Sequence, residues 1–249
     1  MIIRIEELSM NAWPSLQTHL YDGWILRFSQ GYTKRANSIN PIYSSDANIE
    51  EKIKNCEKTY LTKGLPIIYK LTKACYPKNL DKILESKGYK KIDETSVQIL
   101  NITEDYSLEK VSGLDIEYEF TQDWINSFVE CSNTQNESTI GIMTQMLKNI
   151  IGDKICVKMK LDNQIVGCGF GVIEENYMGI FDIIVREEDR GQGIGKAIMQ
   201  EILKEAQKRN VCKAYLQVVV GNSVAESLYN KLGFREKYRY WYRIKNSSI

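Results

Sequence analysis

The chain has 249 residues, of which 43% are hydrophobic and 26% are charged, a composition typical of a folded globular protein. Its 33 basic and 32 acidic residues leave a formal net charge of +1, so no overall field would attract nucleic acid or an anionic membrane. The length suits one large domain or two small ones, and we expect two.

The six cysteines form no Cys-x-x-Cys pair, and His19 is the one histidine that could join them at a metal. We therefore expect neither a disulfide framework nor a metal site. The start of the chain shows no basic and apolar leader, and no apolar run approaches the ~18 residues of a membrane helix. The sequence thus predicts a cytoplasmic protein, monomeric or homodimeric, that binds neither nucleic acid nor membrane.

The first 45 residues predict a β-hairpin. Its strands are expected over 24–28 and 32–39, with the turn at Gln30-Gly31. Pro41 is expected to close the second strand, because proline cannot donate to a strand ladder. The remaining elements of the first half are predicted as a helix, a strand, a helix and a strand, over 49–64, 66–71, 79–88 and 97–102.

A polar segment over 104–113 has no clear periodicity and marks the expected boundary between a domain over 1–110 and a second over 111–249. The second half begins with a predicted strand, two helices and three strands, over 116–120, 124–131, 140–151, 155–161, 165–173 and 178–185. It ends with a helix, a strand, a short helix and an aromatic strand, over 194–210, 216–220, 223–233 and 238–243.

A glycine-rich loop, Arg190-Gly191-Gln192-Gly193-Ile194-Gly195-Lys196, joins the third of these strands to the long helix. Its alternate glycines have no Cβ, so successive main-chain N–H groups can converge at the helix start, where the helix dipole favours negative charge. This pattern predicts a phosphate or pyrophosphate site. It fits neither the dinucleotide fingerprint, because the third glycine comes one residue early, nor a Walker loop, because Ala197 follows Lys196.

Read as [Gln/Arg]-x-x-Gly-x-[Gly/Ala], the loop resembles the acyl-coenzyme A loop of the GCN5-related N-acetyltransferase (GNAT) family, and the element order over 114–249 is similar to that fold. The resemblance implies an α/β (α+β) fold, with a mixed, mostly antiparallel sheet flanked by helices and a splayed strand at the cofactor site. It also implies acetyl-coenzyme A (acetyl-CoA) as co-substrate. The implied cofactor-binding residues are Ile183, Ile184, Val185, Arg190, Gly191, Gln192, Gly193, Ile194, Gly195, Lys196 and Asn222.

The family's second motif is matched by Asn222, Tyr229 and Leu232-Gly233-Phe234. Asn222 and Tyr229 are seven residues apart, close to two helical turns, so both would face one extended cofactor. Tyr229, with an ordinary pKa of ~10, is the candidate catalytic acid that protonates the departing thiolate.

No general base is identified. Where some family members carry a glutamate, this chain has Gly179 and Phe181. Asp182, Glu119, Glu137 and a water chain stay open as alternatives. The resemblance therefore predicts acetyl transfer to a primary amine of a small molecule, an amino acid or a peptide, directly in a ternary complex. The alternative is a coenzyme A (CoA) binding or sensing module without turnover.

The two halves look like copies of one β-α-β-α-β unit. Gly88 and Gly233 both end a short helix and lie 233 − 88 = 145 residues apart, and the strand ends Ile39 and Val185 lie 146 apart. The sequence thus predicts tandem GNAT-like folds of which the first is degenerate. Opposite the glycine loop, residues 44–49 contain no glycine, so the first half is expected to bind no CoA. Three of its residues, Trp24, Tyr32 and Arg35, are expected to line the acceptor cleft.

Overall fold

A computed structural model describes residues 1–103 and 112–245 of the chain. Their contacts divide the chain into two compact units. The first unit comprises residues 1–97, 218–222 and those from Glu236 on, and the second comprises 98–217 and 223–235. The boundary assigned at residue 110 stays a prediction, because it falls in the segment outside the described residues.

The first unit is an α/β unit with a mixed sheet. Its helices are α1 (Ile2–Ala12), the 3₁₀ helix η1 (Lys34–Ala36), α2 (Ile49–Thr62) and α3 (Leu80–Ser86). Its strands are β1 (Gln17–Tyr21), β2 (Trp24–Phe28), β3 (Ile39–Pro41), β4 (Ile67–Thr72), most of β5 (Lys90–Asn101) and most of β11 (Arg235–Lys245). Their order in the sheet is β1-β2-β3-β4-β11-β5, with β3 and β4 parallel and β4 and β11 antiparallel.

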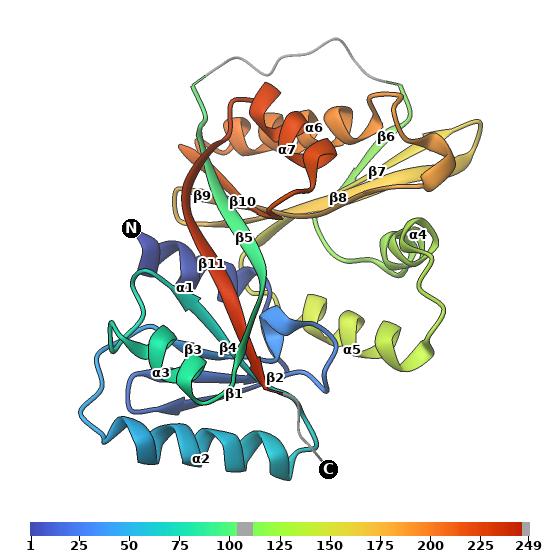
Figure 1. Ribbon diagram of the computed structural model, residues 1–249. Coiled ribbons are helices and arrows are strands. Elements are labelled where there is room, and N and C mark those ends of the chain that lie inside the picture. Colours follow the sequence, from blue (N-terminus) through green and yellow to red (C-terminus); the bar gives the residue numbers. More distant parts are fainter. Residues whose placement is uncertain (104–111, 246–249) are drawn as a thin grey trace. The chain divides into compact units, whose positions relative to one another are not determined.

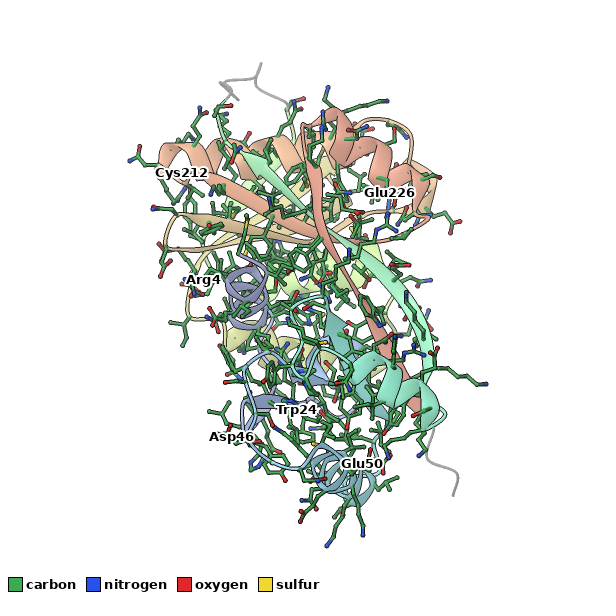
Figure 2. The ribbon with its side chains drawn as sticks, turned by 60° about the vertical axis from the view of Figure 1, so that its left-hand side comes forward. Arg4, Trp24, Asp46, Glu50, Cys212 and Glu226 are labelled. Carbon is green, nitrogen blue, oxygen red and sulfur yellow. The ribbon has the colours of Figure 1, made fainter. Side chains whose placement is uncertain are left out.

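Helix α2 lies along one face of this sheet (Figure 1). Ile53, Cys56 and Tyr60 recur at three- and four-residue spacing, which puts them on one side of the helix, where they pack into the core. Trp24 of β2 belongs to the same core with an exposed fraction of 0%, and Figure 2 marks its place within this unit. The expectation that Trp24 lines an acceptor cleft is therefore wrong, because its ring is fully enclosed by core side chains.

The hairpin predicted for the first 45 residues is also misplaced. The tight turn lies at Asp22 and Gly23, whose φ angles are +43° and +78°. Two positive φ angles define a type I′ turn, which matches the twist of the strands that it joins, here β1 and β2. Most of the segment 32–39 is a loop with η1 instead of a strand, whereas Pro41 is the last residue of β3, where the sequence predicts the strand to close.

The last strand of the chain completes the first unit, and a buried arginine anchors it there. Arg243 on β11 is 4% exposed, and its guanidinium donates to Asp81 at 2.8 Å and to Glu85 at 3.0 Å, both on α3. It also donates to the main-chain oxygen of Tyr89 at 3.1 Å. The ion pair with Arg243 holds the pKa of Asp81 below its ordinary value, so this contact is strongest above the ordinary pKa of an aspartate.

The second unit is a mostly antiparallel sheet between helices. Its strands are β6 (Leu114–Glu117), β7 (Asp153–Leu161), β8 (Gln164–Glu174), β9 (Tyr177–Val185) and most of β10 (Lys213–Val219), in the order β10-β9-β8-β7-β6. Its helices are α4 (Gln122–Ser132), α5 (Glu137–Lys148), the 3₁₀ helix η2 (Glu187–Asp189), α6 (Ile194–Lys208) and α7 (Ser223–Lys231). Helices α4 and α6 cover opposite faces of β8 (Figure 1).

Glycines on β8 let α6 approach the sheet closely. Gly167, Gly169 and Gly171 alternate along the strand, and a Cβ on any of them would come within 3.3 Å of α6 side chains. Those side chains belong to Ile194, Ile198 and Ile202, which are spaced by one helical turn. The opposite side of β8 carries Phe170, whose ring meets that of Trp124 on α4. The glycine stripe therefore fixes the position of α6 and of the loop that precedes it.

The element order confirms the predicted repeat. Both halves contain a strand, a helix, a strand, a helix and a strand, as β3-α2-β4-α3-β5 and β9-α6-β10-α7-β11. Helices α2 and α6 begin at Ile49 and Ile194, which are 194 − 49 = 145 residues apart. Within residues 1–103 and 112–245, no helix combines the length and the apolar character that crossing a membrane requires.

We expect the substitution Gly169→Ala to lower the free energy of unfolding by about 1–3 kcal/mol, because overpacking strains a well-packed core. The added Cβ would lie 2.4 Å from Cδ1 of Ile183 and 3.3 Å from Cγ2 of Ile198. Urea unfolding measures the change. Gly141→Ala, inside α5 with nothing within 4 Å of the new Cβ, is the matched control and should stabilise by about 0.5–1 kcal/mol. Equal stability of the two variants would contradict the packing argument.

Candidate functional site

Strand β9 separates from β10 within the second unit. The two strands pair in parallel over three residue pairs, and the last of these is Gly179 with Tyr215. On the part of the chain that the structure describes, no pairing with β10 continues from Ile180 to Val185, although the other edge of β9 pairs with β8 up to Val185. The predicted splayed strand is therefore present, and over Ile183, Ile184 and Val185 one edge of it is not paired with any strand that the structure describes.

A β-bulge lies where the strands separate. Between the pairs Cys168↔Ile184 and Phe170↔Phe181, two residues of β9, Asp182 and Ile183, oppose the single residue Gly169 on β8. Asp182 adopts φ of +48°, in the left-handed region that a non-glycine residue seldom occupies. A bulge bends its strand and increases the local twist. The bulge thus turns the end of β9 away from β10 just before the glycine loop.

The loop itself presents unpaired main-chain donors. Gly191 and Gly193 have φ of +80° and +83°, a conformation that glycine adopts without steric cost. Gly193 is the N-cap of α6 and supplies no side-chain acceptor. Among the described residues, no acceptor pairs with the N–H groups from Gly191 to Lys196, and the first bond of the helix runs from the Ala197 N–H to the Gly193 oxygen at 3.0 Å. Such a helix start is suited to an oxyanion.

Acidic residues precede the loop, and one arginine partly neutralises them. Glu187, Glu188 and Asp189 form η2. Nε of Arg186 lies 2.7 Å from a carboxylate oxygen of Asp189 and 3.3 Å from one of Glu188. Arg190 follows, and its Nε donates to the Val185 oxygen at 3.4 Å. Arg186 therefore offsets part of the negative charge of η2 just before the loop.

Tyr229 on α7 lies in the same unit as the loop and is half-buried. Burial raises the pKa of its hydroxyl to about 12, and the negative charge of Asp182 adds to the effect. The ring of Tyr229 meets that of Phe234 edge-on, with the centroids 6.2 Å apart. Tyr229 is therefore protonated at neutral pH and keeps a proton that it can donate.

The structure does not bring every predicted residue together. Ile183, Ile184 and Val185, the loop from Arg190 to Lys196, and Tyr229 all belong to the second unit. Asn222 is grouped with the first unit, where its N–H donates to the Val219 oxygen at 3.2 Å. Its place beside Tyr229 on the cofactor stays a prediction.

The candidate bases differ in their surroundings. Glu119 is 74% exposed and pairs with Lys154 at 3.2 Å, and Glu137 is an exposed residue at the start of α5. Asp182 is half-buried, and its charge reaches Tyr229. At Gly179 a Cβ would lie 2.5 Å from the hydroxyl oxygen of Tyr215, so that hydroxyl fills the space of a side chain there. Sequence reasoning missed Tyr215, since nothing in its neighbourhood signals this contact.

Comparisons with known proteins agree with this geometry. A family profile described as "Probable histone acetyltransferase Rv0428c C-terminal" matches residues 1–243. The chain is 29% identical over 248 residues to the "Uncharacterized N-acetyltransferase YobR" of Bacillus subtilis, with 98% of each chain covered.

Two solved structures share the fold at low sequence identity. A GCN5-related N-acetyltransferase from Kribbella flavida superposes with a TM-score of 0.73 at 13% identity, over 99% of this chain and 96% of that one. A tandem GNAT protein from the clavulanic acid biosynthesis pathway gives a TM-score of 0.65 at 10% identity, over 80% of this chain and 70% of that one. Both structures are therefore similar to this chain in fold, one titled a GCN5-related N-acetyltransferase and the other a tandem GNAT protein.

We expect Asp182→Asn to lower the pKa of Tyr229 from about 12, because the neutral amide no longer opposes the phenolate. The pKa should stay above the ordinary ~10 of tyrosine, since burial is the larger cause. NMR titration of ¹³C-labelled tyrosine up to pH 11.5 measures this. Asp162→Asn, in the exposed turn between β7 and β8, is the control and should change nothing. An unchanged Tyr229 titration in Asp182→Asn would refute the coupling.

Proposed function

Because the chain belongs to the probable histone acetyltransferase Rv0428c C-terminal family, we propose that it transfers an acetyl group from acetyl-CoA to a primary amine. Its fold is that of a GCN5-related N-acetyltransferase. The acceptor is a small molecule, an amino acid or a peptide, and transfer is direct within a ternary complex. The observation that carries the proposal is the row of unpaired N–H groups from Gly191 to Lys196 at the start of α6.

The cofactor would use two neighbouring features of the second unit. The loop amides and the positive end of the α6 dipole would hold the pyrophosphate. The free edge of β9, over Ile183, Ile184 and Val185, offers main-chain donors and acceptors in the spacing that an extended amide chain such as pantetheine can match. Arg190, Lys196 and Asn222 would contribute side-chain contacts. The bulge at Asp182 supports the assignment of this edge to the pantetheine arm, because it separates β9 from β10 next to the loop.

Acetyl transfer from the thioester to an amine requires a hydrogen-bond donor to the carbonyl oxygen and an acid that protonates the departing thiolate. The amine nitrogen forms a bond to the thioester carbonyl carbon, the carbon–sulfur bond breaks, and the amine proton leaves to solvent. A main-chain N–H on the free edge of β9 would stabilise the negative charge that develops on the carbonyl oxygen. Tyr229, which its raised pKa keeps protonated at neutral pH, would give its proton to the departing thiolate and then regain one from solvent.

One observation favours the second candidate, a CoA-binding module without turnover. Gly179 and the Tyr215 hydroxyl stand where a strand glutamate would act as base. A CoA release assay across a panel of amines, amino acids and peptides separates the two functions. Free thiol that appears with at least one acceptor supports the transferase, whereas tight CoA binding with no release on any acceptor supports the module.

We expect Gly193→Asp to weaken CoA binding roughly tenfold or more, because the new carboxylate repels the pyrophosphate where the loop amides converge. Calorimetry measures the dissociation constant. Gly64→Asp is the matched control: Gly64 also has a positive φ, +66°, follows α2, and has nothing within 4 Å of a new Cβ. Both variants carry the same strain and charge, so only the first should lose affinity. Equal affinity in the two variants would contradict the assignment of the loop.

We expect Tyr229→Phe to reduce kcat roughly 100-fold or more while the affinity for CoA changes little, because the variant loses a proton donor and keeps the ring. Steady-state kinetics and calorimetry on the same preparation test this. Tyr177→Phe, at the start of β9 in the same unit, serves as the control and should behave like the unmodified protein. Full activity in Tyr229→Phe would reduce Tyr229 to a packing residue.

A further inference from the structure

The first unit contains a loop that corresponds to the glycine loop of the second. With the 145-residue offset between α2 and α6, residues 45–48 correspond to 190–193, and the N-cap Asn48 corresponds to the N-cap Gly193. Figure 2 labels Asp46 in this loop and Glu50 in the first turn of α2. The N–H groups in the first turns of α2 and α6 both need hydrogen-bond acceptors, but the acceptors differ between the two helices.

At α2 the chain supplies its own acceptors. The side-chain oxygen of Asn48 accepts from the N–H groups of Glu50 at 3.0 Å and Glu51 at 3.2 Å. This is an ordinary N-cap, and it occupies donors that are unpaired at the start of α6. The cap accounts for the first turn of α2 but not for the N–H groups of the loop before it.

The loop donors converge on one carboxylate, that of Asp22. It accepts from the N–H of Asp46 at 3.3 Å and from the N–H of Ala47 at 3.1 Å. It also accepts from the hydroxyl of Ser45 at 2.6 Å and from Nζ of Lys52 at 2.9 Å. Two main-chain amides, one hydroxyl and one ammonium around a carboxylate form the donor set of an oxyanion site. These bonds hold the pKa of Asp22 well below its ordinary value.

Lys52 is built into this arrangement. Its side chain is 0% exposed, and Nζ lies 4.4 Å from the ring centroid of Trp24 and 5.5 Å from that of Tyr21. Nζ also donates to the Ser45 hydroxyl at 2.6 Å and to the main-chain oxygen of Asp22. A buried ammonium needs a negative partner, because leaving it unpaired is costly. Asp22 is the carboxylate with which Lys52 pairs among the residues described.

The turn between β1 and β2 places Asp22 next to the loop before α2. Asp22 and Gly23 form the type I′ turn, and a Cβ on Gly23 would lie 2.0 Å from the main-chain oxygen of Ser44. Only glycine permits this close approach. The tip of the hairpin and the loop before α2 are thus in direct main-chain contact.

We propose that the first unit carries an anion-binding site at Ser45, Asp46, Ala47 and Lys52, and that the Asp22 carboxylate is its built-in occupant. The ligand class of the site is a small oxyanion, which the intact protein excludes because Asp22 already fills the donors. Removing the carboxylate opens the site to formate, which replaces the lost group, or to inorganic phosphate. The inference is independent of the activity proposed for the second unit.

Thermal unfolding of Asp22→Ala with sodium formate or sodium phosphate, against sodium chloride at equal ionic strength, tests this proposal. At an anion concentration tenfold above the dissociation constant, we expect the variant's Tm to rise by about 3–6 °C more than that of the unmodified protein. The rise should saturate. A rise equal to that of the unmodified protein would overturn the proposal.

Asp162→Ala is the matched control, because Asp162 also has a positive φ, +48°, in a two-residue turn, the one between β7 and β8. It should show no specific rise in Tm. If Asp22→Ala does not fold, hydrogen exchange in the unmodified protein decides the question. The proposal requires the amides of Asp46 and Ala47 to be protected more strongly than those of Gly191 and Gly193. Equal exchange rates in the two loops would overturn it.

Discussion

The N–H groups at the start of a helix need acceptors, and this requirement shapes both halves of the chain. At α2 the acceptors are the side chains of Asn48 and Asp22. At α6 the residue that corresponds to Asn48 is Gly193, which has no side-chain acceptor, and the N–H groups from Gly191 to Lys196 have no partner among the described residues. One helix start is closed by the protein itself, and the other is suited to an external anion. The functional difference that we propose between the halves follows from this contrast.

Packing inside the second unit keeps the open helix start in place. The glycine stripe of β8 lets α6 lie close to the sheet, and the bulge at Asp182 turns β9 aside just before the loop. Gly169 serves both features, because its missing side chain makes room for Ile183 on β9 and for Ile198 on α6. The loop is therefore supported by a rigid sheet and helix, which preserves the direction of its donors without a bound ligand.

The sequence predicted the features that local chemistry determines. Residue spacing and turn residues predicted the glycine loop, the helix after it, the hairpin of β7 and β8 and the element order of the repeat. The dipeptide Asp22-Gly23 is itself a typical type I′ hairpin signal, and it marks the true turn between β1 and β2. The contact of Tyr215 with Gly179 and the anchoring of Arg243 by Asp81 join residues 36 and 162 positions apart, so no local pattern reveals them. The cytoplasmic location stays a prediction.

The most direct test of this account is an NMR titration of the ¹⁵N-labelled full chain with CoA. The account predicts saturable shifts of the main-chain N–H resonances of Gly191, Gly193 and Gly195, because these donors gain an acceptor. The resonances of Asp46 and Ala47 should not move, because Asp22 already accepts from them. Shifts at Asp46 and Ala47 with none in the glycine loop, or no shift at either helix start, would contradict it.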